Sequence, residues 1–203
     1  VVAVASGHFI HDISSVRIDD FLASTEIVEH LINMGHTRIA CVKGHPNQMA
    51  SQRRFEGYQA ALKEAGIARD AELVQQGYFT YRSGLEAVEK LLSLRKPPTA
   101  IFASNDDMAA AAVSVAHRRG LRVPLDLSIV GFDDTSAATT VWPELTTVRQ
   151  PISSMADSAI DILLRAIRRN GNETRVVVDQ VVAHQLVMRG SVAPAKTAAK
   201  TRS

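Results

Sequence analysis

The feature that most constrains the fold is a repeated order of short apolar strand, polar turn and amphipathic helix, which starts near residue 36. The predicted strands cover residues 38–44, 72–79, 98–104 and 127–132, and the predicted helices cover 51–66, 81–94 and 105–120. Gly66 and Gly120 mark two of the helix ends. Strands that alternate with helices of this length indicate parallel strands covered on both faces. We therefore expect an α/β fold.

Segments at both ends fall outside this order. Residues 1–20 contain two short strands, residues 152–170 form a helix with an apolar stripe, and residues 175–192 are rich in β-branched side chains. Such an arrangement predicts two lobes, with chain crossings near residues 18–20, 147–151 and 176–180. The expected extents are 1–18 and 150–176 for a partial N-terminal lobe, 19–149 and 177–193 for a nearly complete C-terminal lobe, and 194–203 for a disordered tail.

Composition excludes several classes of protein. With 203 residues, 46% of them hydrophobic, the chain can bury a substantial core, but no apolar run approaches the roughly 20 residues of a spanning helix. We therefore expect no membrane partner. The net charge of +2 depends on three basic residues near the C-terminus, so the remainder is close to neutral and does not favour direct nucleic-acid binding. The single cysteine, Cys41, lies in an apolar run and is expected to be a buried thiol.

The turn after each strand of a parallel sheet opens at the carboxyl edge, where ligands bind. Polar and aromatic side chains follow the predicted strands there: His45, Asn47, Gln52, Arg54, Phe79, Tyr81, Asn105, Asp106, Asp107, Asp133 and Asp134. They offer donors, acceptors and aromatic faces, without a nucleophile beside a base, a metal-binding spacing or a phosphate loop. This chemistry suits a small hydroxylated ligand. We expect no catalytic residue, metal or cofactor.

Several of these residues also have a structural interpretation. Asp106 or Asp107 could cap a helix, and Asp134 could start a turn. Arg54 could be a solvated surface residue, although a cation is not favoured in the first turns of a helix. Gly35 and His36 resemble a helix stop followed by a cation that suits the negative end of the helix dipole. The sequence leaves the structural and the ligand-binding interpretations of the strand-end residues open.

Six segments, taken in order, resemble the effector-binding domain of the LacI/GalR family of bacterial transcription regulators. They are "GHTRIACVKG", "SQRRFEGYQAAL", "PTAIFASNDDMAAAAV", "GLRVPLDLSIVGFDD", "LTTVRQP" and "LVMRGS", and the resemblance covers about residues 1–193. It implies two Rossmann-like lobes of the periplasmic-binding-protein type, with a sugar or sugar derivative bound between them. It also implies a cytoplasmic homodimer that binds operator DNA through a headpiece. That headpiece and the first part of the N-terminal lobe are not in this sequence, so we expect an N-terminally truncated chain.

The resemblance assigns roles to six positions. It makes Arg54 and Asp133 ligand-binding residues, Asn105 a hydroxyl-binding residue, Phe79 a stacking aromatic, Gln150 a cleft-facing crossover residue and Asp19 the carboxylate of the first crossing. Gln52, from the strand-end set, completes the predicted site.

Two other functions are consistent with a fold of this type. A periplasmic sugar-binding protein of a transport system would share the architecture. An enzyme could use a magnesium cluster of Asp106, Asp107, Asp133 and Asp134, but the spacing of "GFDDT" is not that of the phosphatases. The ordered series of segments favours the regulator.

Overall fold

The main sheet has four parallel strands in the order β4-β3-β5-β6. The computed structural model describes residues 1–7, 11–168 and 176–196. The strand bounds are Ile39–Lys43 for β3, Val74–Gln76 for β4, Ala100–Ala103 for β5 and Ser128–Val130 for β6. Cys41 of β3 pairs with Val74 on one side and Phe102 on the other. Because all four strands run the same way, the loops that follow them open at one edge of the sheet.

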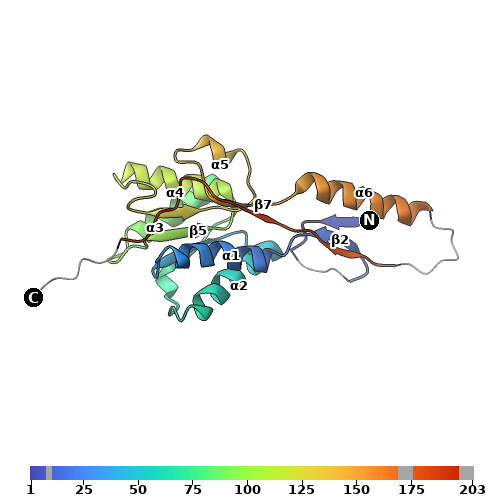
Figure 1. Cartoon of the computed structure of the whole chain (residues 1–203), viewed down its shortest axis with the longest axis horizontal. Helices are drawn as coiled ribbons and strands as arrows, with labels where there is room; N and C mark the ends of the chain where they lie inside the picture. The colour runs from blue at the N-terminus through green and yellow to red at the C-terminus, as the bar shows by residue number, and fades with distance from the viewer. Residues whose placement is uncertain (8–10, 169–175, 197–203) are drawn as a thin grey trace, which may run out of the picture.

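Helices cover both faces of this sheet (Figure 1). The bounds are Asp20–Asn33 for α1, Met49–Glu64 for α2, Tyr81–Leu92 for α3 and Asp106–Arg118 for α4. Helices α1 and α2 pack together, and so do α3 and α4. A short 3-10 turn, Ala71–Leu73, precedes β4, and the short helix α5, Ala137–Thr140, follows β6.

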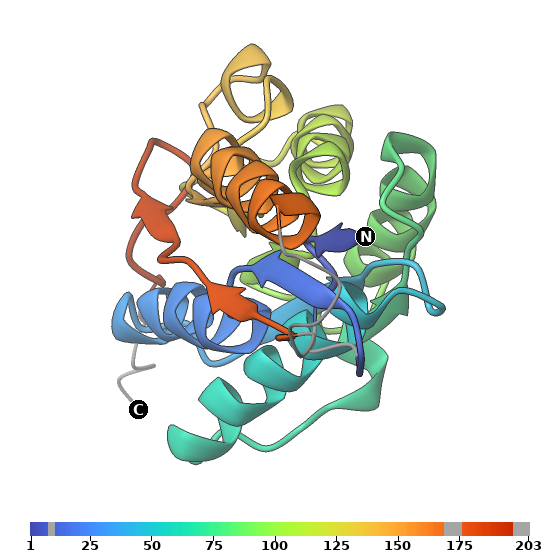
Figure 2. The ribbon, with the colours of Figure 1, turned by 90° about the vertical axis from the view of Figure 1, so that its right-hand side faces the viewer.

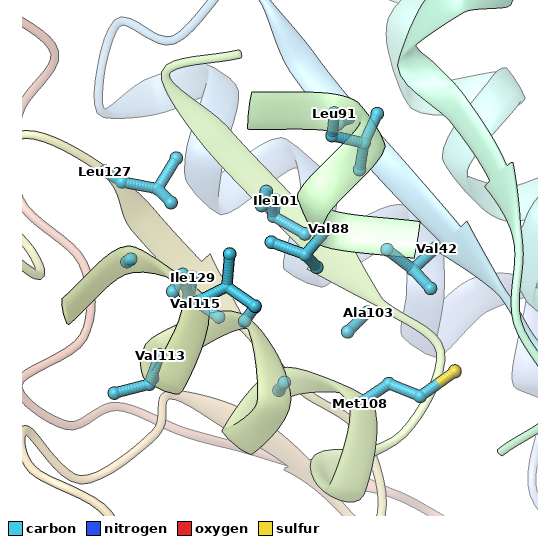
Figure 3. Close-up of a cluster of buried hydrophobic side chains, with 14 of the residues drawn as sticks. Val42, Val88, Leu91, Ile101, Ala103, Met108, Val113, Val115, Leu127 and Ile129 are labelled. Carbon is cyan, nitrogen blue, oxygen red and sulfur yellow. The ribbon is translucent and has the colours of Figure 1, made fainter. Parts of the chain in front are cut away.

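The core is divided by the sheet into two clusters. In β5, Ile101 and Ala103 belong to the cluster beneath α3 and α4, whereas Ala100 and Phe102 belong to the cluster beneath α1 and α2. All four are fully buried, as expected where alternate residues of a strand face opposite covered sides. Figure 3 shows the first cluster, with Met108 of α4 beside Ala103. Burial on both faces makes this sheet a rigid support for the loops at its edge.

A smaller parallel sheet lies at the other end of the molecule (Figure 1), which faces the viewer in Figure 2. Its strands are β1 (Val2–Val4), β2 (Ser14–Arg17) and β8 (Asp179–Val181), in the order β1-β2-β8. Helix α6, Ile152–Arg168, packs on β1 and β2 and buries Met155. Its outer residues Ile160 and Ile167 are exposed. Two parallel sheets with helices therefore make up the fold, and the α/β expectation is confirmed.

Three segments connect the two sheets. They run from β2 to α1, from β7 (Thr147–Arg149) to α6, and from β8 to β9 (Gln185–Val187). Strands β7 and β9 pair antiparallel, and Figure 1 shows β7 between the two ends of the molecule. Strand β8 pairs with β2 and therefore belongs to the small sheet, and the third crossing follows Val181. This crossing lies later in the chain than the boundary expected at residue 177. The extents of the two lobes otherwise remain a prediction.

Some elements were not predicted from the sequence. Helix α1 is absent from the predicted elements, which contain only its end at Gly35, and α5 and β7 lie in a segment that shows no regular period. The expected helix ends at Gly66 and Gly120 are confirmed, with φ of 68° and 73°. Of the tail expected at 194–203, residues 197–203 lie outside the described residues, whereas Ala195 donates its backbone N–H to Met34 O at 2.8 Å. In the described part of the chain, no helix is long and apolar enough to cross a membrane.

His36 is not the cation at a helix end that the sequence suggested, but a buried hydrogen-bonded ring. Its side chain is 3% exposed, with Nδ1 3.0 Å from Thr99 Oγ1 and Nε2 3.0 Å from both Ser128 Oγ and Ala193 O. Burial lowers the pKa of His36, because the charged imidazole loses its hydration. The ring therefore joins α1, β6 and the C-terminal segment through hydrogen bonds.

Candidate functional site

A cleft of about 450 Å³ lies at the carboxyl edge of the large sheet. Ten residues line it: Ala5, Gln48, Ala50, Arg54, Phe79, Asn105, Asp133, Thr135, Gln150 and Ile152. Ala5 follows β1, and Ile152 is the first residue of α6, so the small sheet side contributes to the wall. The other lining residues follow β3 to β6 or belong to the β7 crossing. The cleft thus lies where the two parts of the molecule meet.

Arg54 is the central charged residue of the cleft. It projects from the second turn of α2 and is 5% exposed. Its Nε donates to Asp20 Oδ1 at 2.7 Å and its Nη1 donates to Ser104 O at 2.7 Å. The same Nη1 lies 3.2 Å from Asp133 Oδ1. A buried guanidinium needs partners of this kind, so the solvated-surface interpretation of Arg54 is wrong.

Two aromatic rings lie next to the guanidinium of Arg54. Its central carbon lies 3.7 Å from the centroid of the Phe132 ring and 5.8 Å from that of Phe79, distances at which a cation is attracted to a ring. Phe79 has a φ of 60°, and its ring occupies the space where a Cβ on Gly44 would lie. A side chain at position 44 would therefore displace the ring from the cleft.

Asp133 lies in the loop after β6 and lines the cleft. It has a φ of 106°, an uncommon conformation for a side-chain-bearing residue. Its backbone N–H donates to Val148 O at 2.8 Å, and its Oδ1 accepts from Gln150 Nε2 at 2.7 Å. Burial raises the pKa of Asp133, against the lowering effect of Arg54. The carboxyl group is thus held between the large sheet and the β7 crossing.

Asn105 combines the two roles that the sequence left open. Its Oδ1 accepts from Met108 N at 3.1 Å and caps α4, and its Nδ2 donates to Phe79 O at 3.0 Å. It also lines the cleft and is 7% exposed. The cap is therefore Asn105, while Asp106 is the first residue of the helix.

Two predicted site residues lie elsewhere. Asp19 caps α1 by accepting from the N–H groups of Phe21 and Leu22, both at 3.1 Å. Gln52 is exposed, and its Nε2 donates to Glu56 Oε1 at 3.0 Å. Neither residue lines the cleft. The structure places five of the seven predicted residues together: Arg54, Phe79, Asn105, Asp133 and Gln150.

Asp20 is the main residue that the sequence analysis missed. It is 4% exposed and forms the 2.7 Å bond to Arg54. In the sequence it is only the second member of an Asp-Asp pair, and the pattern does not tell which member caps the helix. Gln48, Ala50, Thr135, Ala5 and Ile152 were also not predicted, because their position depends on how the two parts of the chain meet.

Two more aspartates lie beside the cleft. Asp106 is fully buried, and its carboxylate accepts from Thr147 Oγ1 at 2.6 Å and from Thr135 N at 2.7 Å. Burial raises the pKa of Asp106 to about 6. Asp134 contacts Arg149 Nε at 2.6 Å and Arg189 Nη2 at 2.7 Å. Although burial opposes the shift, these arginines lower the pKa of Asp134.

These contacts do not assemble a magnesium cluster. Within residues 1–7, 11–168 and 176–196, no three His, Cys, Asp or Glu side chains are placed to hold a metal. The aspartates at the two ends of the proposed cluster are instead satisfied separately, Asp106 by threonines and Asp134 by arginines. The polar groups that line the cleft are hydrogen-bond donors and acceptors.

Residues 28–192 match the family described as the periplasmic binding protein-like domain. The chain belongs to this family. The transcriptional regulator DegA of Bacillus subtilis is 41% identical over 182 residues, which are 90% of this chain and 53% of DegA. A structure described as a complex of the transcriptional regulator CelR with cellobiose gives a TM-score of 0.86 at 35% identity, covering 94% of this chain and 58% of that one.

A second similar structure is that of a LacI family transcriptional regulator from Enterococcus faecium with bound ribose. It superposes with a TM-score of 0.86 at 27% identity, covering 96% of this chain and 71% of that one. The chain spans about half the length of the curated relatives it matches. These relatives are named as transcriptional regulators and not as enzymes or transport proteins. The resemblance to the effector-binding domain of the LacI/GalR family is thereby confirmed.

Proposed function

We propose that the chain is the ligand-sensing domain of a LacI/GalR-type transcriptional regulator, and that a small sugar-like effector binds in the cleft. The observation that carries this proposal is the gathering of Arg54, Asn105, Asp133, Phe79 and Gln150 around one cavity. Carboxylate and amide groups hydrogen-bond to hydroxyl groups, and an aromatic ring can cover the apolar face of a sugar. The cellobiose and ribose complexes of the related regulators support the same ligand class.

The position of the cleft supports a switching role. Ala5 and Ile152 belong to the small sheet side, whereas Arg54 and Asn105 belong to the large sheet side. A ligand that touches both sides favours the relative orientation in which its contacts are best. It shifts the equilibrium between orientations only by the difference in its affinity for them. In the complete regulator, this shift would change the affinity for operator DNA.

The remaining parts of the proposal concern the whole protein. The curated relatives are named as regulators of the helix-turn-helix type, which supports operator DNA as a partner through a headpiece, a homodimeric assembly and a cytoplasmic location. The cleft would bind its effector without a cofactor and without catalysis. The names of the relatives give no support to the transport alternative.

A thermal-shift screen of the natural protein against neutral sugars, glycosides, nucleosides, sugar acids and sugar phosphates tests the effector. A ligand at a hundred times its dissociation constant should stabilise the native state by about 2.7 kcal/mol. Asp133→Asn should weaken its binding by roughly tenfold or more, about 1.4 kcal/mol, because the carboxylate is lost from the cleft. A bound ligand should also change the affinity for operator DNA in a gel-shift titration.

The matched control is Asp107→Asn, which removes a carboxylate from an exposed position in the first turn of α4. This variant should bind the effector like the parent protein. The absence of any bound carbohydrate or nucleoside, or equal loss of affinity in both variants, would contradict the assignment of the cleft.

A further inference from the structure

The cleft contains a cation whose charge is already compensated. Arg54 is the one basic residue among the ten that line it. Its guanidinium contacts two carboxylates, Asp20 at 2.7 Å and Asp133 at 3.2 Å. Both Asp20 and Arg54 are almost fully buried, so solvent screens this pair little. The three groups together carry a formal excess of one negative charge.

Groups just behind the cleft add to that negative charge. Asp106 lies beneath Thr135, and its carboxylate receives hydrogen bonds only from neutral partners among the described residues, namely Thr135 and Thr147. Thr135 is itself a lining residue. An anionic ligand in the cleft would therefore face several carboxylates and one arginine that is shared between two of them.

The N-termini of α2, α3 and α4 do not reverse this balance. The positive end of a helix dipole can hold an anion through free N–H groups. However, side chains already cap α3 and α4, through Thr80 and Asn105. At the start of α2, the backbone of Gly7 lies so close to Ala50 N that a Cβ on Gly7 would clash with it. The chain itself thus covers the helix start that lacks a side-chain cap.

We propose that the cleft selects uncharged hydroxylated ligands over their acidic or phosphorylated forms, and that Asp20 is the residue that sets this preference. The inference rests on the proposed function of the cleft. Asp20 acts through Arg54: it engages the guanidinium from behind, so that the cation serves as a hydrogen-bond donor without presenting a net positive charge to the ligand. Asp133 Oδ2 makes no hydrogen bond to the described residues and supplies an acceptor for a ligand hydroxyl.

Isothermal titration calorimetry of the natural protein with matched ligand pairs tests this preference. The probes are glucose with glucuronate and with glucose 6-phosphate, ribose with ribose 5-phosphate, and cellobiose. The parent protein should bind the neutral member of a pair at least roughly tenfold more tightly, a difference of about 1.4 kcal/mol. Asp20→Asn should reduce that ratio by roughly tenfold, because the asparagine retains an oxygen for Arg54 Nε but leaves the arginine with one charged partner fewer.

Two further variants separate charge from folding. Glu29→Gln removes a carboxylate from the same helix at a position outside the cleft and should leave the ratio unchanged. Asp106→Asn removes the carboxylate behind Thr135 and should shift the ratio in the same direction as Asp20→Asn, by a smaller factor. If Asp20→Asn does not fold, Asp106→Asn still tests whether loss of a carboxylate changes the ratio of the two affinities.

The outcomes distinguish the preference from the function itself. If the parent protein binds the acidic member of a pair more tightly, the proposed role of charge is wrong, although the cleft remains a binding site. The same holds if neither Asp20→Asn nor Asp106→Asn changes the ratio. If none of the neutral or acidic probes binds the parent protein, the proposed function falls, and the inference that depends on it falls too.

Discussion

Asp106, Asp133 and Asp134 lie in or beside the loop after β6. The two sides of this loop differ in how many arginines contact these carboxylates. On the cleft side, Asp133 shares Arg54 with Asp20, and Asp106 contacts only threonines among the described residues. On the far side, Asp134 has two arginines to itself, Arg149 and Arg189. The pKa follows the same order: burial raises that of Asp106 to about 6, burial also raises that of Asp133, and the two arginines lower that of Asp134.

The comparison teaches how one short loop serves two purposes. On its far side the loop is bound to the chain crossings by two cations, since Arg149 is the last residue of β7 and Arg189 follows β9. The cleft side has fewer cations, so the Asp133 carboxylate remains available to accept hydrogen bonds from ligand hydroxyl groups. Adjacent residues in the sequence can differ this way because Asp133 and Asp134 both have positive φ, of 106° and 55°, and leave the strand in a tight turn.

Removal of Arg54 should have the largest effect on stability. Arg54→Ala leaves Asp20 buried without its partner, and such losses cost about 3 to 5 kcal/mol. The matched control, Arg149→Ala, removes a half-exposed arginine while Asp134 retains Arg189, and should cost less than about 1 kcal/mol. Urea denaturation followed by circular dichroism measures both. Similar losses in the two variants would show that the cation shortage on the cleft side has no energetic consequence.

The Asp106 carboxyl should give the next largest effect, as a dependence of stability on pH. Its pKa is raised in the folded state, from 3.8 to about 6, so the folded protein holds a proton that the unfolded chain releases. Its contribution is most favourable below about pH 4 and is lost as the pH rises through 6, by roughly 3 kcal/mol in total.

The measurement is the difference in unfolding free energy between the parent protein and Asp106→Asn at several pH values from 4 to 7. The free energy of unfolding of the parent protein minus that of Asp106→Asn should fall with increasing pH. The parent protein loses the contribution of its carboxyl group, whereas the asparagine does not titrate. A flat difference for Asp106→Asn would mean that its carboxyl group is not destabilised by burial.

Much of this arrangement could be predicted from the sequence. Parallel strands bring their carboxyl ends to one edge, so residues that follow different strands, such as Arg54, Phe79, Asn105 and Asp133, were expected to meet, and they do. Strands β3, β5 and β6 were predictable because nearly all of their residues are buried and their segments are mainly apolar.

Other features depend on details that the pattern does not contain. Helix α1 buries the polar residues Asp20 and Ser24 and exposes Leu22, so its apolar stripe is interrupted. In the pair Asp19-Asp20 the first residue caps the helix and the second binds Arg54 behind the cleft. In the pair Asp133-Asp134 the order is the reverse. Which aspartate of each pair lies at the cleft depends on the backbone angles and on partner residues that are distant in the sequence. A local sequence pattern reveals neither.

Replacement of Asp134 should give the smallest effect and sharpen the comparison most directly. Asp134→Asn removes the charge between Arg149 and Arg189, and we expect a loss of about 1 to 2 kcal/mol at neutral pH, because one arginine is half-exposed and remains solvated. Since the pKa of Asp134 is lowered in the folded state, its contribution is present at neutral pH and is lost only below the usual pKa of aspartate, as the pH falls through the lowered pKa of the folded state.

The variant should therefore lose stability at pH 7 but match the parent protein in acid, which is the opposite trend to that of Asp106. Its affinity for the effector should be unchanged, whereas Asp133→Asn, one residue away, should weaken binding. Urea denaturation at two pH values and calorimetric titration of both variants make the test. If Asp134→Asn weakens binding as much as Asp133→Asn, the loop acts as a single unit, and the division between a ligand side and a crossing side is wrong.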